Sequence, residues 1–214
     1  MNLKNIKVNF LGDSITQGVA ISASEKSYHK LIAKKYELAA ARNYGISGTR
    51  FARQTKPSLE NPKFDLDFCK RFSEMDDDAD LIVIFGGTND FGHGDAPIGD
   101  FSDRTPDTFS GACHYLMSGL INKYPEARIV FMTPLHRSSE NTPNAHGKIL
   151  LDYVEIIKKT VAYYSLPVID LWSMSGIQPC VPIIKEKYCP DGLHPNDKGH
   201  EKIAEFVGNF LSNL

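Results

Sequence analysis

Four polar segments of the chain contain the side chains that acyl transfer requires, and three of them follow apolar runs that predict buried strands. GDSITQG places Ser14 directly after the first run, NYGISGTR and GGTND follow the second and third, and CPDGLHPND lies near the C-terminus. Acyl transfer needs a hydroxyl nucleophile, an imidazole base, a carboxylate that orients the base, and donors for the oxyanion. A serine at a strand end is also a common turn residue or helix cap. The rest of the sequence must decide between these interpretations.

Short apolar runs alternate with longer helical patterns along the chain. Strands are predicted within 6–12, 38–48, 79–90, 127–134 and 166–172, and helices within 22–36, 64–75, 105–124, 147–164 and 196–211. This alternation, without repeats or a linker, predicts one α/β domain over residues 1–214, with helices on both faces of a parallel sheet. Because the carboxyl ends of parallel strands share one edge of the sheet, we expect the polar segments to meet there.

Local signals indicate where two of the helices begin. Ser22 and Glu25 have the spacing of a capping box for the helix within 22–36. Thr105, followed by Pro106, is the expected cap of the helix within 105–124. These residues therefore predict both helix starts from local sequence alone.

Composition restricts the classes of function. The chain has 214 residues and a formal net charge of −2, with no basic block, so a nucleic-acid partner is not expected. No segment has the ~20 apolar residues of a membrane span, and the N-terminus lacks the apolar core of a signal peptide. We therefore expect a cytoplasmic protein without a membrane span. The four cysteines are expected to be free thiols, although Cys180 and Cys189 share one loop and could pair.

The polar segments together resemble the motifs of the SGNH hydrolases, also called GDSL esterases. Gly-Asp-Ser, Asn-x-Gly-x-x-Gly, Gly-Gly-Thr-Asn-Asp and Asp-Gly-Leu-His-Pro occur in the family's order and extend over nearly the whole chain. Ile15 stands where the family name has leucine. The resemblance implies a flavodoxin-like, three-layer α/β/α sandwich and a serine esterase that needs no metal and no cofactor.

The resemblance also implies a role for each matching residue. Ser14 corresponds to the nucleophile, His194 to the base, and Asp191 to the carboxylate that orients the base. The backbone N–H groups of Ser14 and Gly48 and the side-chain amide of Asn89 correspond to the oxyanion donors. Glycine suits position 48 because a backbone donor must approach the substrate without a Cβ in the way.

Other polar residues near the strand ends have less specific expectations. His93, Phe91 and His136 follow strand ends and are expected to line the substrate pocket, whereas His200 is expected to be a solvated helix residue. We expect the remaining short polar side chains at the strand ends to be framework that satisfies loop backbone groups; these are Asp13, Asn43, Thr88 and Asp90.

Three alternative classes are weighed against this interpretation. A metallophosphoesterase requires an early Asp-x-His pair that this chain lacks, an α/β-hydrolase requires a Gly-x-Ser-x-Gly elbow that is also missing, and a non-catalytic binding module would have lost site residues.

The polar segments that follow the third and fourth strands favour a short acyl group, acetyl first, on a polar alcohol such as a carbohydrate. Lysophospholipase and acyl thioesterase activities are the alternatives within the family, and oligomeric state is not indicated.

Overall fold

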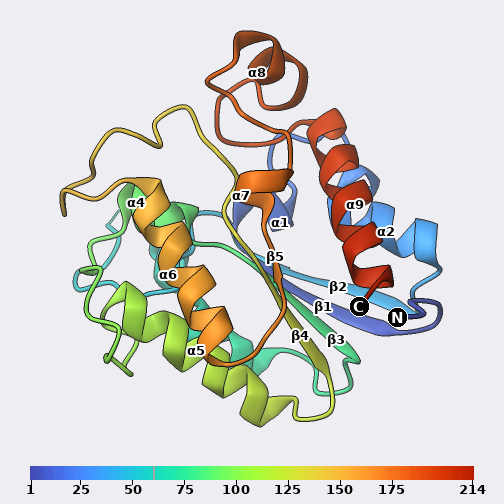
Figure 1. The fold of residues 1–214 in the computed structure, drawn as a ribbon, viewed down its shortest axis with the longest axis horizontal. Coiled ribbons are helices and arrows are strands. Elements are labelled where there is room, and N and C mark those ends of the chain that lie inside the picture. Colours follow the sequence, from blue (N-terminus) through green and yellow to red (C-terminus); the bar gives the residue numbers. More distant parts are fainter. Residues whose placement is uncertain (60) are drawn as a thin grey trace.

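Five parallel strands form one sheet in the computed structural model, which describes residues 1–59 and 61–214 (Figure 1). The strands are β1 (Lys7–Gly12), β2 (Ala40–Gly45), β3 (Leu81–Phe85), β4 (Arg128–Met132) and β5 (Val168–Ile169). Their order in the sheet is β2-β1-β3-β4-β5, which is the flavodoxin-like order. Gly12, the last residue of β1, pairs with Gly45 of β2 and with Phe85 of β3, so these strands end at one level. The predicted α/β fold is confirmed.

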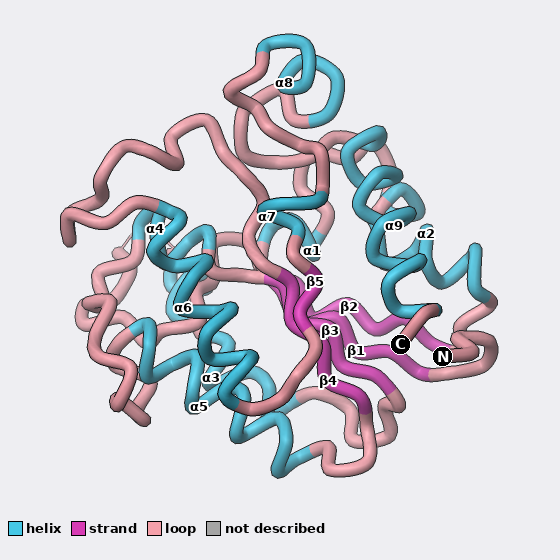
Figure 2. The backbone as a smooth tube through the Cα atoms, in the orientation of Figure 1, coloured by secondary structure: helices cyan, strands magenta, loops and turns pink. Residues whose placement is uncertain are grey.

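Helices cover both faces of the sheet (Figure 2). The α-helices are α1 (Ser14–Gln17), α2 (Tyr28–Tyr36), α3 (Phe68–Arg71), α4 (Thr88–His93), α5 (Phe109–Lys123), α6 (Leu150–Tyr163), α7 (Leu171–Met174), α8 (Pro182–Tyr188) and α9 (Asp197–Ser212). One apolar cluster joins the sheet to α2 and α9, and the other joins it to α3, α5 and α6. The three layers follow from this arrangement, because α2 and α9 bury apolar faces against one side of the sheet and α3, α5 and α6 against the other.

Strand β3 is the central strand and explains the strongest apolar run in the sequence. All of its side chains are buried. Val83 and Phe85 face the cluster with α2 and α9, whereas Ile82 and Ile84 face the cluster with α5 and α6. A strand that is covered on both faces lacks the polar alternation of a half-exposed strand, and LIVIF shows this pattern.

The predicted capping box at the start of the helix within 22–36 is wrong. A short 3₁₀ helix, η1 (Ser24–Lys26), comes first, and α2 begins only at Tyr28. The Ser22 hydroxyl and N–H instead donate to the carboxylate of Asp197 in α9. The Tyr28 N–H donates to Nδ1 of His200 at 3.1 Å. A distant histidine therefore provides the cap that the local sequence was expected to supply.

The predicted start of the helix within 105–124 is also wrong by three residues. Helix α5 begins at Phe109, and its N-cap is Thr108, whose hydroxyl accepts from the Gly111 N–H at 3.0 Å. Thr108 has the extended backbone of an N-cap, with φ −126° and ψ 157°. The carbonyl of Pro106 accepts from the Arg53 N–H of a neighbouring loop, so the residues before Thr108 serve a tertiary contact.

Two further segments differ from the sequence prediction. The helix within 64–75 is broken into η2 (Pro62–Asp65), α3 and η3 (Phe72–Glu74), and the segment after β5 contains α7 and α8, which were not predicted. Helix α8 projects beyond the sheet edge (Figure 1). In the described part of the chain, no helix has both the length and the apolar character needed to cross a membrane.

Candidate active site

Ser14 lies where β1 turns into α1. Gly12 allows the turn, because a Cβ there would lie 2.0 Å from Oγ1 of Thr16. The Asp13 carboxylate caps α1 by accepting from the Ile15 N–H at 3.0 Å. Ser14 is therefore the first residue of α1, and only 4% of it is exposed. The helix cap is Asp13, which leaves the Ser14 hydroxyl available for another partner.

The structure brings Ser14, His194 and Asp191 into one hydrogen-bonded chain. Nε2 of His194 lies 3.0 Å from Oγ of Ser14, and Nδ1 of His194 lies 2.7 Å from Oδ2 of Asp191. The other oxygen of Asp191 accepts from the N–H groups of Leu193 and His194 at 2.8 and 2.7 Å. Since the carboxylate can only accept, Nδ1 carries the proton and Nε2 is free to accept from the serine hydroxyl.

The loop that carries the histidine is held by its own turn and by a neighbouring loop. Gly192 has φ +79°, and a Cβ there would lie 2.1 Å from Oγ of Ser138. The Ser138 N–H donates to the Gly192 carbonyl at 2.8 Å. Partial burial alone would raise the pKa of Asp191, but the two N–H donors and the imidazole hold the pKa of this carboxyl below its usual range. Asp191 therefore stays ionised beside the imidazole.

Hydrogen bonds hold the residues on either side of Gly48. The Ser47 N–H donates to the side chain of Gln17 in α1 at 2.6 Å, and the Asn89 amide donates from Nδ2 to the Thr49 carbonyl at 3.0 Å. Gly48 lies between these two anchored neighbours, with φ +77°. Among the described residues, the N–H groups of Ser14 and Gly48 have no acceptor.

A buried arginine that no sequence motif singles out joins the loops of the site. Only 6% of Arg71 is exposed, and its guanidinium donates to the carbonyls of Gly12, Tyr44 and Leu66 and to Oγ1 of Thr49. Burial lowers its pKa to about 10, so it remains charged at neutral pH. Arg71 therefore fixes the ends of β1 and β2 against the loop that contains Gly48. Its position in a helical pattern offered no signal of this role.

Two buried carboxyl groups, Asp13 and Asp90, accept hydrogen bonds from backbone N–H groups near the site. Asp90 accepts from the N–H groups of Phe51 and Ala52 at 3.0 and 2.9 Å. Burial raises the pKa of Asp13 to about 7 and that of Asp90 to about 6, since water is lost around the charged form. Asp90 holds a loop and Asp13 caps α1, so both satisfy backbone groups as expected of framework residues.

The residues expected to line a pocket lie in different environments. Phe91 is buried in the core under α5 and α6, so the expectation for it was wrong. His136 is held by Glu140 at 2.8 Å and by the Trp172 ring, with ring centroids 3.8 Å apart. His93 does line a cavity, as expected. His200 was expected to be solvated but is fully buried between α9 and α2, where it caps α2.

Two of the cavities among the described residues bear on the choice of substrate. One, of about 510 Å³, is lined by Arg50, Ser58, Leu59, Phe64 and His93. Of these residues, His93 contacts Asn89. The larger, of about 770 Å³, lies between the loop after α1, helix α8 and the start of α9, and its apolar lining includes Ala20, Ile21 and Ile183.

All four cysteines are free thiols, so Cys180 and Cys189 do not pair. In residues 1–59 and 61–214, no group of three or more His, Cys, Asp or Glu is placed to hold a metal ion.

A flavodoxin-like sheet with a Ser–His–Asp set at its carboxyl edge has the architecture of a serine hydrolase. The family model described as GDSL-like lipase/acylhydrolase matches residues 10–202. The chain therefore belongs to the GDSL-like lipase/acylhydrolase family and is a hydrolase of the SGNH type, as the motifs predicted.

Solved structures with this fold cover nearly the whole chain. A protein from Lactobacillus plantarum is 29% identical, with a TM-score of 0.84 and 98% of each chain covered. A lipase/acylhydrolase from Enterococcus faecalis is 21% identical, with a TM-score of 0.65 and 97% of this chain and 96% of that chain covered. A search of curated proteins finds no sequence that matches the chain significantly.

Proposed function

We propose that the protein hydrolyses carboxylic esters through a covalent acyl-Ser14 intermediate. The observation that carries this proposal is the continuous hydrogen-bonded chain from Asp191 through His194 to Ser14, with distances of 2.7 and 3.0 Å. Oγ of Ser14 attacks the ester carbonyl carbon while Nε2 of His194 accepts the hydroxyl proton. Asp191 holds the imidazole in the required tautomer and stabilises the imidazolium that forms.

The oxyanion that develops on the carbonyl oxygen accepts from three donors. These are the N–H groups of Ser14 and Gly48 and Nδ2 of Asn89, and such donors each contribute about 10²- to 10³-fold in rate. Collapse of the tetrahedral intermediate expels the alcohol, which takes the proton from His194. Water then attacks the acyl-serine, with the same histidine as base, and releases the carboxylic acid and free Ser14.

The test of this mechanism is a Ser14→Ala variant, with Ser173→Ala as the matched control. Ser173 also follows a strand at the start of a short helix, but its side chain is exposed on α7. Ser14→Ala should abolish ester hydrolysis, and a serine-directed phosphonate should add its mass to the parent and to Ser173→Ala only. Undiminished turnover in Ser14→Ala, or labelling at another residue, would exclude the acyl-Ser14 mechanism.

We infer that the substrate is a short-chain acyl ester, acetyl first, of a polar alcohol such as a carbohydrate. The support is the polar character of the loops after β3 and β4, in which Ser138 and Ser139 are exposed and can hydrogen-bond hydroxyl groups. Such loops offer little apolar area to an alkyl chain. The expected preferred substrates are acetylated sugars, and acetate release from them is the direct assay.

A second candidate is hydrolysis of longer acyl esters, as by a lysophospholipase or an acyl thioesterase. The observation that favours it is the cavity beside α8, where Ile183 is 65% exposed and faces Ala20 and Ile21 across the cavity. Val181 and Met174 expose further apolar surface on the same segment. Each buried CH₂ contributes ~0.8 kcal/mol, so a chain bound there would gain about fourfold in kcat/KM per CH₂.

A series of p-nitrophenyl esters from acetate to decanoate separates the two candidates. For the acetyl esterase, kcat/KM falls as the chain lengthens, and Ile183→Ser has no effect. For the longer-chain enzyme, kcat/KM rises with chain length and the rise is lost in Ile183→Ser. Leu151→Ser is the matched control, because Leu151 is an exposed leucine on the distant helix α6.

A further inference from the structure

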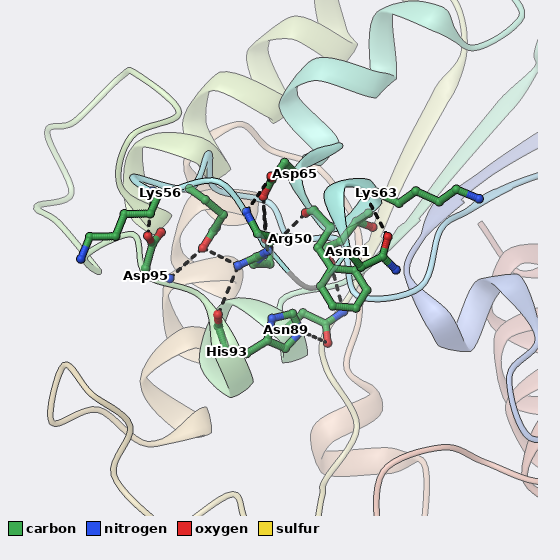
Figure 3. Close-up of polar contacts among 12 residues, drawn as sticks. Arg50, Lys56, Asn61, Lys63, Asp65, Asn89, His93 and Asp95 are labelled. Atoms are coloured by element: carbon green, nitrogen blue, oxygen red, sulfur yellow. Dashed lines mark hydrogen bonds and ion pairs between the residues drawn. The ribbon is translucent and has the colours of Figure 1, made fainter.

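The Asn89 side-chain amide makes hydrogen bonds through both of its polar atoms. Nδ2 donates to the Thr49 carbonyl at 3.0 Å, and Oδ1 lies 3.2 Å from Nε2 of His93 (Figure 3). His93 follows Asn89 by one turn of α4, so the two side chains share a helix face. Because an amide oxygen can only accept, Nε2 of His93 must carry a proton.

The hydrogen-bond partners of the Asn89 amide determine which of its two flipped orientations is favoured. In the reversed orientation, Oδ1 would face the Thr49 carbonyl, and this contact between two acceptors would be repulsive. The Thr49 carbonyl therefore sets the orientation of the amide, and Nε2–H of His93 binds the Oδ1 atom that this orientation presents. In the observed orientation one Nδ2 hydrogen binds Thr49, and the second Nδ2 hydrogen remains for another acceptor. Without His93, only the hydrogen bond from Nδ2 to Thr49 would restrain rotation about the last side-chain bond of Asn89, a torsion that is broad by itself.

Contacts with Arg50 and Phe64 hold His93 in place. Its carbonyl accepts from the guanidinium of Arg50 at 3.2 Å, and its ring packs on Phe64 with centroids 5.4 Å apart. The Phe64 ring also covers Gly48, since a Cβ on Gly48 would lie 2.2 Å from that ring. One aromatic wall therefore contacts both Gly48 and the histidine that binds Asn89.

We propose that His93 is a positioning residue for the oxyanion donor, and that its Nε2–H fixes the Asn89 amide with the free Nδ2 hydrogen directed at the substrate oxyanion. The inference rests on the proposed function, because it assumes that Asn89 acts as a donor to the reacting carbonyl. A hydrogen-bond donor to the oxyanion accelerates acyl transfer only if it already points to the position where the negative charge develops in the transition state. His93 acts on this orientation and does not itself touch the substrate carbonyl.

The protonation state of His93 agrees with this role. Partial desolvation, together with the nearby charges of Arg50 and Arg137, lowers the pKa of the ring. The ring is therefore neutral under ordinary assay conditions, and its single proton lies on Nε2, where Asn89 accepts it. Nδ1 is then unprotonated.

Two substitutions separate the hydrogen bond from the packing. His93→Phe keeps an aromatic ring against Phe64 but removes the donor, whereas His93→Gln removes the ring but places an amide N–H near the position of Nε2. We expect His93→Phe to lower kcat by about 10- to 100-fold, part of the loss for a whole oxyanion donor, with KM changed less than twofold. His93→Gln should recover most of the lost kcat. Thermal unfolding of both variants identifies any loss of fold.

A double-mutant cycle with Asn89→Ala provides the decisive readout. If His93 acts only through Asn89, His93→Phe should change kcat less than twofold in the Asn89→Ala background. Wild-type kcat in His93→Phe, equal losses in the Phe and Gln variants, or additive effects in the cycle would each overturn the inference. Activity in Ser14→Ala would refute the proposed function instead, so the two failures are distinguishable.

Discussion

Gly48 provides the most demanding test of the site, because its replacement by alanine should damage both stability and catalysis. The residue has φ +77°, a conformation that costs a residue with a Cβ about 1–2 kcal/mol. A Cβ added there would also lie 2.2 Å from Cδ1 and Cε1 of Phe64. Relieving such overpacking typically costs about 1–3 kcal/mol. The free energy of unfolding of Gly48→Ala should therefore fall by about 2–5 kcal/mol.

The chain contains a matched control for the backbone part of this effect. Gly147 has φ +68°, but a Cβ there would meet nothing within 4 Å. Gly147→Ala should therefore show only the backbone strain of about 1–2 kcal/mol. In a Phe64→Ala background the clash disappears, so Gly48→Ala should then cost about as much as Gly147→Ala does in the parent.

Urea unfolding and steady-state kinetics together measure the two consequences. If the loop relaxes to relieve the clash, part of the stability is recovered, but the Gly48 N–H moves away from the oxyanion and kcat falls by about 10²-fold. Gly147→Ala should keep the parental kcat. A Gly48→Ala variant that is as stable as Gly147→Ala and also retains full kcat would refute this reasoning, because the loop would then tolerate a Cβ without displacing its N–H.

Two further predictions concern the carboxyl groups of the site. Asp191→Asn should lower kcat by about 10⁴-fold, because an amide that donates to Nδ1 of His194 imposes the wrong imidazole tautomer. Steady-state kinetics measures this loss, and an unchanged thermal unfolding transition shows that the variant is folded. A loss below tenfold would contradict the prediction. Burial raises the pKa of Asp13 to about 7 in the folded protein, whereas the carboxyl ionises near pH 4 in the unfolded chain. The free energy of unfolding is therefore highest below about pH 4 and falls as the pH rises to 7. Urea unfolding from pH 4 to 8 should therefore show Asp13→Asn gaining stability relative to the parent, with an upper limit on the order of 4 kcal/mol, whereas a constant difference would contradict the shifted pKa.

The sequence alone determined the class of fold and the family. Apolar runs such as LIVIF report burial on both faces of a strand, and their alternation with helical patterns leaves few arrangements other than a covered parallel sheet. The polar segments after these runs then had to share one edge of the sheet. The resemblance of the motifs to those of the SGNH hydrolases singled out Ser14, Asp191 and His194, since Asp191 and His194 lie in the polar segment that does not directly follow a predicted strand. Hydrogen bonds join these three side chains in the folded chain, while their catalytic roles remain a proposal.

Only the tertiary structure decided how the site is held. A local pattern carries no information about a partner far away in the chain, so the cap of α2 was assigned to Ser22 when His200 supplies it. Arg71 looked like an ordinary helix residue but donates to carbonyls at the ends of two strands. The contact of His93 with Asn89 depends on the direction of two side chains after a short helix forms. Periodicity reports which residues are buried, whereas hydrogen-bond partners depend on distances and angles that exist only once the layers have packed.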